Sequence, residues 1–168
     1  MIGNFQRVSQ QQLEALLADP SGITATLYGY EDENEGVDED RLHIDVDKAW
    51  HGIHFLLSGD AWEGTLPHGF IMAGEPIGDE DVGYGPARGL TASEVRRVAM
   101  ALLAIDEPKL RSRFDSAAMM AAEIYPQIWD RDPDRDDTLG YLLEHFGVLQ
   151  QFVKDAAEAG DAMPIYIN

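Results

Sequence analysis

One stretch of the chain, IDVDKAWHGIHFLLSG, combines histidines and aspartates at spacings that could bind a metal ion. Asp47, His51 and His54 are separated by four and three residues, so a helix would turn all three toward one side. One carboxylate and two imidazoles bind zinc or iron when a further histidine, such as His68 or His145, completes the set. The stretch lacks the glutamate of the HExxH zinc-protease motif, which lies between two histidines. A packed helix accounts for the same spacing.

The packed helix is predicted over residues 45–57, with Asp45 as its N-cap. Trp50 and His54 share its apolar face, and we expect both side chains to be largely buried. The other residues of that face are Val46, Ile53 and Leu57. A buried histidine needs only a hydrogen-bond partner, and so does a buried indole N–H. We therefore predict a structural helix whose aspartate and histidines bind no metal, and we predict no cofactor.

The loop DRDPDRDD resembles the first half of a calcium-binding loop. Its four aspartates alternate with other residues, as in an EF-hand: they are Asp130, Asp132, Asp134 and Asp136. An EF-hand also needs glycine at its sixth position and glutamate at its twelfth, where this chain has Arg135 and Tyr141. The acidic run at residues 30–40 has Gly36 in a suitable place for the sixth position of such a loop. The glutamate is missing there too, because Leu42 stands at the twelfth position. Both segments are predicted to be acidic surface rather than calcium sites.

The glycine-rich segment GYGPARGL differs from phosphate-binding loops in the spacing of its glycines, and no Lys-Ser/Thr pair follows it. We interpret it as a shaped turn in which Tyr84 and Arg88 are held by hydrogen bonds. The alternative is that Arg88 helps to hold an anion at the start of the following helix. If the protein binds a small molecule or is an enzyme, we expect the pocket between the 45–57 helix and this turn. The ligand-binding candidates are then Trp50, His54, Tyr84 and Arg88, and none is assigned a catalytic role.

Caps and periodicity predict the remaining elements. Thr91 and Glu94 form a capping box, which marks the start of a helix. Helices are expected at residues 10–18, 92–105, 107–114, 116–124 and 138–159 in addition to the one already described, and strands at residues 2–8, 70–73 and 163–167. A terminal strand on its own would leave its backbone groups unpaired. The chain is therefore predicted to be a single α+β domain with a small, mainly antiparallel sheet that includes both terminal strands and packs against several helices.

Charge and composition narrow the functional classes. The 168 residues include 31 acidic and 12 basic side chains, for a net charge of -19. Such a field repels phosphate backbones and anionic lipids, so we expect neither a nucleic-acid partner nor a membrane partner. The absence of cysteine excludes disulfides and thiol chemistry. The start of the chain is not a secretory signal and no apolar run could span a bilayer, so a cytoplasmic protein is expected.

Three blocks of the sequence resemble the YfbM-like family of small bacterial proteins. They are IDVDKAWHGIHFLLSG, GYGPARGLTASEV and EIYPQIW, in that order after a short MIG start. The resemblance covers essentially the whole chain, residues 1–168, and implies one α+β domain in the bacterial cytosol. It implies no activity, because the family is one of unknown function and has no agreed catalytic residues. The acidic run at residues 30–40 and the DRDPDRDD loop depart from it.

Two functional classes remain open. An enzyme needs acid, base or nucleophilic groups that converge in a cleft, and the sequence shows no such set. A binding protein needs only a presented surface, and three segments supply an acidic one: Tyr30–Asp40, Glu75–Asp81 and Trp129–Asp137. We favour a non-enzymatic module that binds a basic protein, for example an immunity protein that neutralises a basic toxin. Electrostatic steering would speed that encounter.

Overall fold

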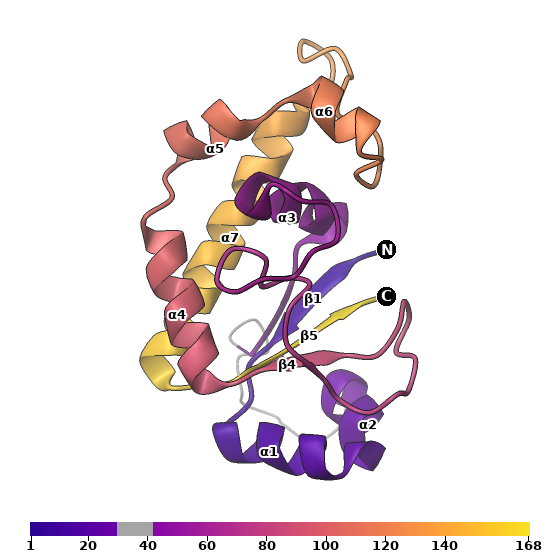
Figure 1. The fold of residues 1–168 in the computed structure, drawn as a ribbon, viewed down its shortest axis with the longest axis vertical. Helices are drawn as coiled ribbons and strands as arrows, with labels where there is room; N and C mark the ends of the chain where they lie inside the picture. Colours follow the sequence, from indigo (N-terminus) through magenta and orange to yellow (C-terminus); the bar gives the residue numbers. More distant parts are fainter. Residues whose placement is uncertain (30–41) are drawn as a thin grey trace.

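A five-stranded antiparallel sheet lies at the centre of the computed structural model, which describes residues 1–29 and 42–168 (Figure 1). The acidic run at residues 30–40 lies outside the described residues. The strands are β1 (Gly3–Gln6), β2 (His43–Asp45), β3 (Glu75–Pro76), β4 (Arg88–Leu90) and β5 (Met163–Ile167), in the order β2-β1-β5-β4-β3. The α+β domain predicted from the sequence is confirmed.

The two terminal strands pair with each other at the middle of this sheet. Phe5 lies opposite Ile165, and β5 continues the sheet to β4 on its other side. The backbone N–H of Ile2 donates to Asn168 O at 2.6 Å, so pairing extends to the end of the chain. The strand predicted at residues 70–73 is wrong. These residues form turns, and their apolar character reflects burial of Phe70 and Ile71 rather than pairing in the sheet.

Seven helices surround the sheet in the described part of the chain. They are α1 (Gln10–Ala18), α2 (Ile23–Tyr28), α3 (Trp50–Ser58), α4 (Ala92–Leu103), α5 (Glu107–Arg113), α6 (Ser116–Ala121) and α7 (Thr138–Ala159). Capping boxes at Ser9 and Thr91 begin α1 and α4, and the one at Thr91 was predicted from the sequence. Helix α6 ends at Ala121, three residues before the predicted end at residue 124. No helix within residues 1–29 and 42–168 combines the length and apolar character that crossing a bilayer requires.

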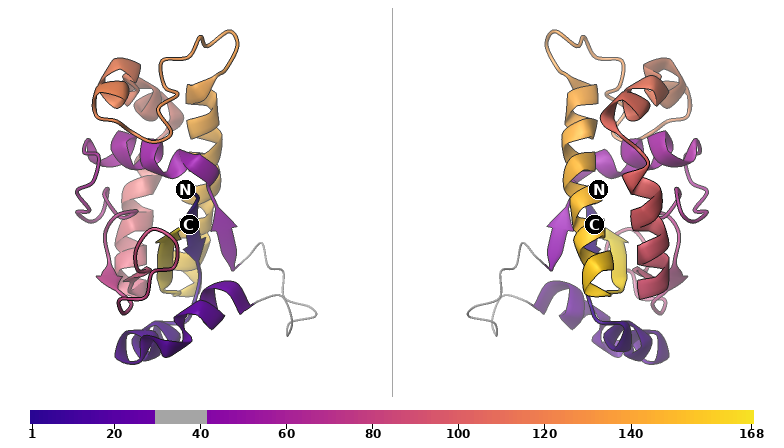
Figure 2. Two further views of the ribbon diagram at one scale, coloured as in Figure 1. Left: turned by 90° about the vertical axis from the view of Figure 1, so that its right-hand side faces the viewer. Right: turned by 90° about the vertical axis from the view of Figure 1, so that its left-hand side faces the viewer.

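The sheet separates two hydrophobic clusters. Side chains alternate between its faces, so neighbours on β5 belong to different clusters: Ile165 packs with α3, α4 and α7, whereas Tyr166 packs with α1 and α2. Figure 2 shows α1 and α2 at one end of the molecule and α7 running along the other helices. The result is a layered domain in which α3 crosses the ends of the central strands.

The Thr91 capping box gives a first test of the fold. Thr91 Oγ1 accepts from the Glu94 backbone, and the Glu94 carboxylate accepts from the Thr91 backbone at 2.8 Å. A Thr91→Ala variant is expected to lose about 1 kcal/mol of unfolding free energy, measured by urea denaturation. Thr65→Ala is the matched control, because the Thr65 side chain is exposed and bonds to no described residue. Equal losses in the two variants would contradict the role of the cap.

Candidate functional site

The histidine-rich helix begins later than its sequence predicts. Asp45 does not cap it: Asp45 is the last residue of β2, and its carboxylate accepts from the backbone N–H of Asp47 at 2.9 Å. A turn of 3-10 helix over Asp47–Ala49 follows, and α3 starts at Trp50. Pairing of residues 43–45 with β1 takes them out of the helix. This non-local contact explains the difference.

His51 is a buried structural histidine, although its position predicts one nearer the edge of the apolar face. It is 0% exposed, and both ring nitrogens bind backbone groups. Nδ1 accepts from the N–H of Tyr125 at 3.0 Å, which makes Nε2 the protonated nitrogen that donates to Ala61 O at 2.8 Å. Burial lowers the pKa of His51, so the ring is neutral near pH 7. Neither nitrogen is free to bind a metal.

Asp47 and His54 do not join His51 in a cluster. The Asp47 carboxylate accepts from the hydroxyl of Tyr141 at 2.9 Å. Burial, followed by this hydrogen bond, raises the pKa of Tyr141 well above its ordinary value. The Asp47–Tyr141 pair lines a cavity of about 460 Å³ at the start of α7. Among residues 1–29 and 42–168, no three histidine, aspartate or glutamate side chains are arranged to share a metal ion.

Trp50, His54 and Arg88 lie in the buried layer between α3 and the sheet. Trp50 is 1% exposed and His54 is 0% exposed. Burial lowers the pKa of His54 to about 4, and the charges of His51 and Arg88 act in the same direction while Asp60 opposes them. Arg88 Nη2 donates to Ile71 O at 3.0 Å, which ties β4 to the turn over α3.

Tyr84 is separate from these three candidates. Its side chain is 61% exposed, and only its backbone N–H is anchored, by donating to Ile167 O at 2.9 Å. Tyr84 lies in the turn before β4 whereas Arg88 lies in the strand and points toward α3. The structure therefore brings Trp50, His54 and Arg88 into one layer and leaves Tyr84 at the surface.

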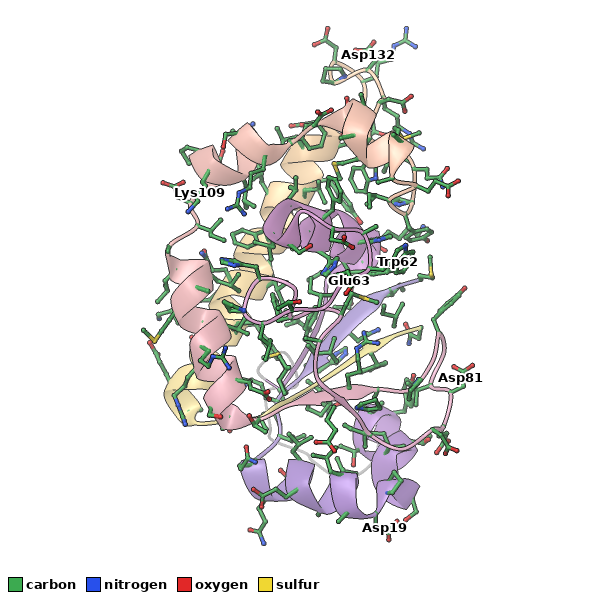
Figure 3. The ribbon with its side chains drawn as sticks, viewed as in Figure 1. Asp19, Trp62, Glu63, Asp81, Lys109 and Asp132 are labelled. Atoms are coloured by element: carbon green, nitrogen blue, oxygen red, sulfur yellow. The ribbon has the colours of Figure 1, made fainter. Side chains whose placement is uncertain are left out.

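The long connection between α3 and β4, residues 59–87, is strongly acidic, and we call it the acidic connection. It contains no lysine or arginine, and its acidic residues are Asp60, Glu63, Glu75, Asp79, Glu80 and Asp81. Trp62 lies beside Glu63, with 58% of its surface exposed, and Asp81 lies at a distance from it (Figure 3). The sequence analysis missed Trp62 and noted only the Glu75–Asp81 part. An exposed tryptophan between two acids was the available signal.

Two aspartates fix the shape of the acidic connection. Asp60 Oδ1 accepts from the backbone N–H groups of Trp62 at 2.8 Å and Glu63 at 2.9 Å. Asp81 Oδ1 accepts from the N–H groups of Gly83 and Gly85 in the same manner. These backbone hydrogen bonds lower the pKa of both carboxyls. Trp62 and Tyr84 are thus presented by turns with defined geometry.

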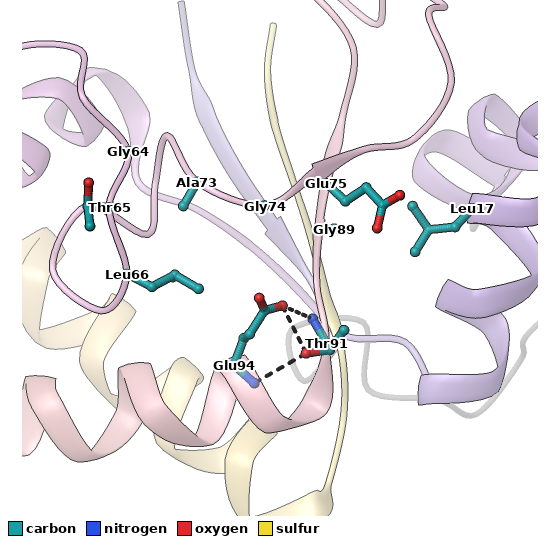
Figure 4. A pocket seen from close by; sticks show the side chains of 10 residues that line it. All are labelled: Leu17, Gly64, Thr65, Leu66, Ala73, Gly74, Glu75, Gly89, Thr91 and Glu94. Atoms are coloured by element: carbon teal, nitrogen blue, oxygen red, sulfur yellow. Dashed lines mark hydrogen bonds between the residues drawn. The ribbon is translucent and has the colours of Figure 1, made fainter.

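A cavity of about 450 Å³ opens between the acidic connection, α1 and the start of α4 (Figure 4). Leu17, Leu66 and Ala73 supply apolar walls, and Glu75 and Glu94 supply carboxylates. Glu94 Oε2 is engaged by both the backbone N–H and the hydroxyl of Thr91, whereas the Glu75 side chain bonds to no described residue. Apolar walls with a free carboxylate suit a cationic side chain that has an aliphatic stem.

The low pKa of His54 makes stability depend on pH. In the unfolded chain His54 binds a proton near the ordinary pKa of 6.5, and in the folded chain it binds that proton only near pH 4. The full unfolding free energy is therefore present above pH 6.5, and part of it is lost as the pH falls toward 4. From about pH 7.5 to about pH 5.5, His54 alone is expected to remove about 1 kcal/mol of unfolding free energy. A His54→Gln variant should show a correspondingly flatter dependence in urea denaturation. An unchanged dependence would contradict burial of a neutral His54.

Comparison with known proteins agrees with this architecture. The model of a domain of unknown function (DUF1877) matches residues 1–166. Among solved structures, a protein of unknown function, YfbM from Escherichia coli, is similar over 98% of both chains, with a TM-score of 0.68 and 21% sequence identity. At that identity the likeness shows a shared fold. No curated protein matches the chain.

Proposed function

Because this chain belongs to the DUF1877 family, a domain of unknown function, its role has to be inferred from its own surface, and we propose that it binds a basic protein through the acidic connection. The proposal rests on Trp62, which is exposed in a segment that contains six acidic residues and no lysine or arginine. The protein acts as a non-enzymatic binding module.

Charge is unevenly distributed over the described surface, which supports a directed encounter. Basic residues gather on α4 and α5, namely Arg96, Arg97, Lys109, Arg111 and Arg113. The acidic connection lies toward the viewer in Figure 1, and α7 lies behind it, as the side views in Figure 2 also show. A basic partner is attracted to the acidic connection and repelled by α4 and α5. Electrostatic complementarity of this kind raises association rates and sets orientation.

Trp62 and Tyr84 supply the affinity that charge alone does not. Tryptophan and tyrosine are enriched among the residues that dominate interface energies. The Trp62 ring lies 4.4 Å from that of His51, so one face packs against the domain while much of the rest is exposed. The turns capped by Asp60 and Asp81 hold both aromatic residues before binding, which reduces the entropy lost on association.

The cavity beside Glu75 accommodates a lysine or arginine side chain of the partner. Leu17 and Leu66 contact the aliphatic stem, and the Glu75 carboxylate accepts from the cationic head. An immunity protein that neutralises a basic toxin in the bacterial cytoplasm is the specific form of this function that we propose. The acidic surface then covers basic residues that the toxin uses for its own activity.

A comparative pull-down from the native cell tests the proposal. The baits are the wild-type protein, the variant Glu63→Gln/Glu75→Gln/Asp79→Asn, and the control Glu144→Gln/Asp155→Asn/Glu158→Gln, which removes the same charge from α7. We expect wild type and control to recover the same basic protein at low salt, less of it at moderate salt, and the connection variant to recover little. The recovered protein should be toxic when expressed alone and harmless when expressed with this chain. Equal recovery by all three baits would contradict the proposal.

A further inference from the structure

A cavity of about 460 Å³ lies where the start of α7 meets the turn before α3 and the loop at residues 122–137, which is orange in Figure 1. Pro126, Ile128 and Tyr141 supply its apolar wall. Sites for small molecules have volumes of about 300–1,000 Å³ and combine apolar walls with a few polar groups. The cavity therefore has the size and the apolar lining of a site for one small molecule.

Thr138, the first residue of α7, lies in the wall of this cavity and has an unsatisfied hydroxyl. The residue is only 5% exposed, and its side chain forms no hydrogen bond with the part of the chain that the structure describes. Its backbone N–H is already engaged, because it donates to Asp136 O at 2.9 Å. Most buried side-chain hydroxyls have a hydrogen-bond partner. A polar ligand in the cavity supplies the partner that Thr138 lacks.

Asp47 presents a carboxylate with one free oxygen to the same cavity. Its Oδ2 accepts from the Tyr141 hydroxyl at 2.9 Å, whereas Oδ1 has no partner among the described residues. Asp47 and Gln127 both have left-handed backbone, with φ of 47° and 62°. Gln127 lies between the wall residues Pro126 and Ile128. Left-handed backbone is unfavourable for residues other than glycine and is concentrated at functional sites.

The charges around the cavity favour a ligand that carries both signs. Arg131 and Asp136 neutralise each other, because Arg131 Nη1 donates to Asp136 Oδ2. The other charged residues of the lining are Asp47 and Lys48, and the Lys48 ammonium forms no ion pair within residues 1–29 and 42–168. Asp47 repels a simple anion, as does the net charge of the chain, and Lys48 repels a simple cation. A zwitterion gives each of these two charges a partner.

We infer that this cavity binds a free α-amino acid with an apolar side chain. The ammonium group of the amino acid donates to Asp47 Oδ1, and its carboxylate accepts from Lys48 Nζ and the Thr138 hydroxyl. Its side chain packs on Pro126 and Ile128. The Tyr141 hydrogen bond holds the Asp47 carboxylate in place before binding, which reduces the entropy lost on association. This site is separate from the partner surface proposed above, because its lining comes from α7 and two segments outside the acidic connection.

Backbone amide signals in ¹H–¹⁵N NMR spectra test this site, with L-leucine and L-phenylalanine as probes. We expect both amino acids to shift the amide signals of Lys48 and Tyr141 in a saturable manner. N-acetyl-L-leucine lacks the ammonium group and L-leucinamide lacks the carboxylate, so each should bind about tenfold more weakly than L-leucine. Equal affinity for L-leucine and its two derivatives would overturn the inference, and so would the absence of saturable shifts at Lys48 and Tyr141.

Two conservative variants separate ligand contacts from structural effects. Asparagine tolerates left-handed backbone and still accepts from the Tyr141 hydroxyl, so Asp47→Asn removes a charge and retains the fold. Thr138→Val keeps the shape of a buried side chain and removes its hydroxyl. We expect L-leucine to bind about tenfold more weakly to Asp47→Asn and about fivefold more weakly to Thr138→Val. Asp47→Asn should also lose the preference for L-leucine over N-acetyl-L-leucine, which a structural change alone does not produce.

Asp134→Asn is the matched control, because it removes one charge from the same loop at a residue outside the cavity lining. This control should bind L-leucine with the wild-type affinity. Wild-type affinity in folded Asp47→Asn would overturn the inference. If neither cavity variant folds, the wild-type protein decides: preference for L-leucine over both derivatives supports the site, and equal binding of the three overturns it.

Discussion

A His51→Ala variant is expected to lose about 4 kcal/mol of unfolding free energy, because two penalties add. The Tyr125 N–H and Ala61 O lose their shared partner inside the protein. A cavity also forms where the imidazole now stacks 4.6 Å from the ring of Trp50. Urea denaturation at pH 7.5 measures the loss, and a large shift of the midpoint with an unchanged slope is expected.

The matched control is His68→Ala, because His68 is half-buried and its ring bonds to no described residue. His68→Ala should lose about 1 kcal/mol of unfolding free energy or less. A His51→Ala variant as stable as the control would show that the ring is not a structural link between α3, the acidic connection and residue 125. A transition metal bound in proportion to protein, and lost with His51, would contradict the structural interpretation in a different way.

Local patterns were sufficient to predict much of the fold. Ser9, Thr91 and Asp106 each offer a side-chain oxygen to the first turn of a helix, and helices begin after each of them. The final helix ends at a glycine with left-handed backbone, Gly160, as its sequence predicts. Caps act through residues three or four positions away, so one sequence contains the necessary information.

Features that depend on contacts between distant parts of the sequence were harder to predict from local patterns. Asp45 has the chemistry of an N-cap, but pairing with β1 makes it the end of a strand. Residues 70–73 have the composition of a strand, but they form a buried turn. The ligand-binding candidates Arg88 and Tyr84 lie apart for a similar reason. Arg88 is in β4 and points inward, whereas Tyr84 precedes the strand and points outward. Trp62 was missed although acidic residues on both sides of it, Asp60 and Glu63, are a local sign that its side chain is exposed.

A Trp62→Ala variant is expected to weaken binding of the basic partner by about 2 kcal/mol, or roughly 30-fold in Kd. The exposed part of the indole is an apolar surface within the acidic connection. Its removal takes away the anchor and leaves every charge in place. Titration calorimetry with the partner recovered by the pull-down measures the change.

Met100→Ala provides the control for this loss. Met100 is 74% exposed on α4, outside the acidic connection, and its truncation should leave Kd unchanged. Because Trp62 also contacts the His51 ring, the unfolding free energy of Trp62→Ala has to be measured as well, so that weakened binding is compared between folded proteins. An unchanged Kd for folded Trp62→Ala would remove the acidic connection from the interface.

The most direct measurement of the central claim is the association rate constant with the recovered partner as a function of salt. The side chains of Glu63, Glu75 and Asp79 make no hydrogen bond or ion pair with another described residue, so neutralising them changes charge with little effect on the fold. We predict a wild-type rate that falls steeply with salt, and a rate for Glu63→Gln/Glu75→Gln/Asp79→Asn that is about tenfold lower at low salt and less salt-dependent. The control with three neutralised acids on α7 should behave as wild type. Equal rates and equal salt dependence for the two triple variants would contradict binding through the acidic connection.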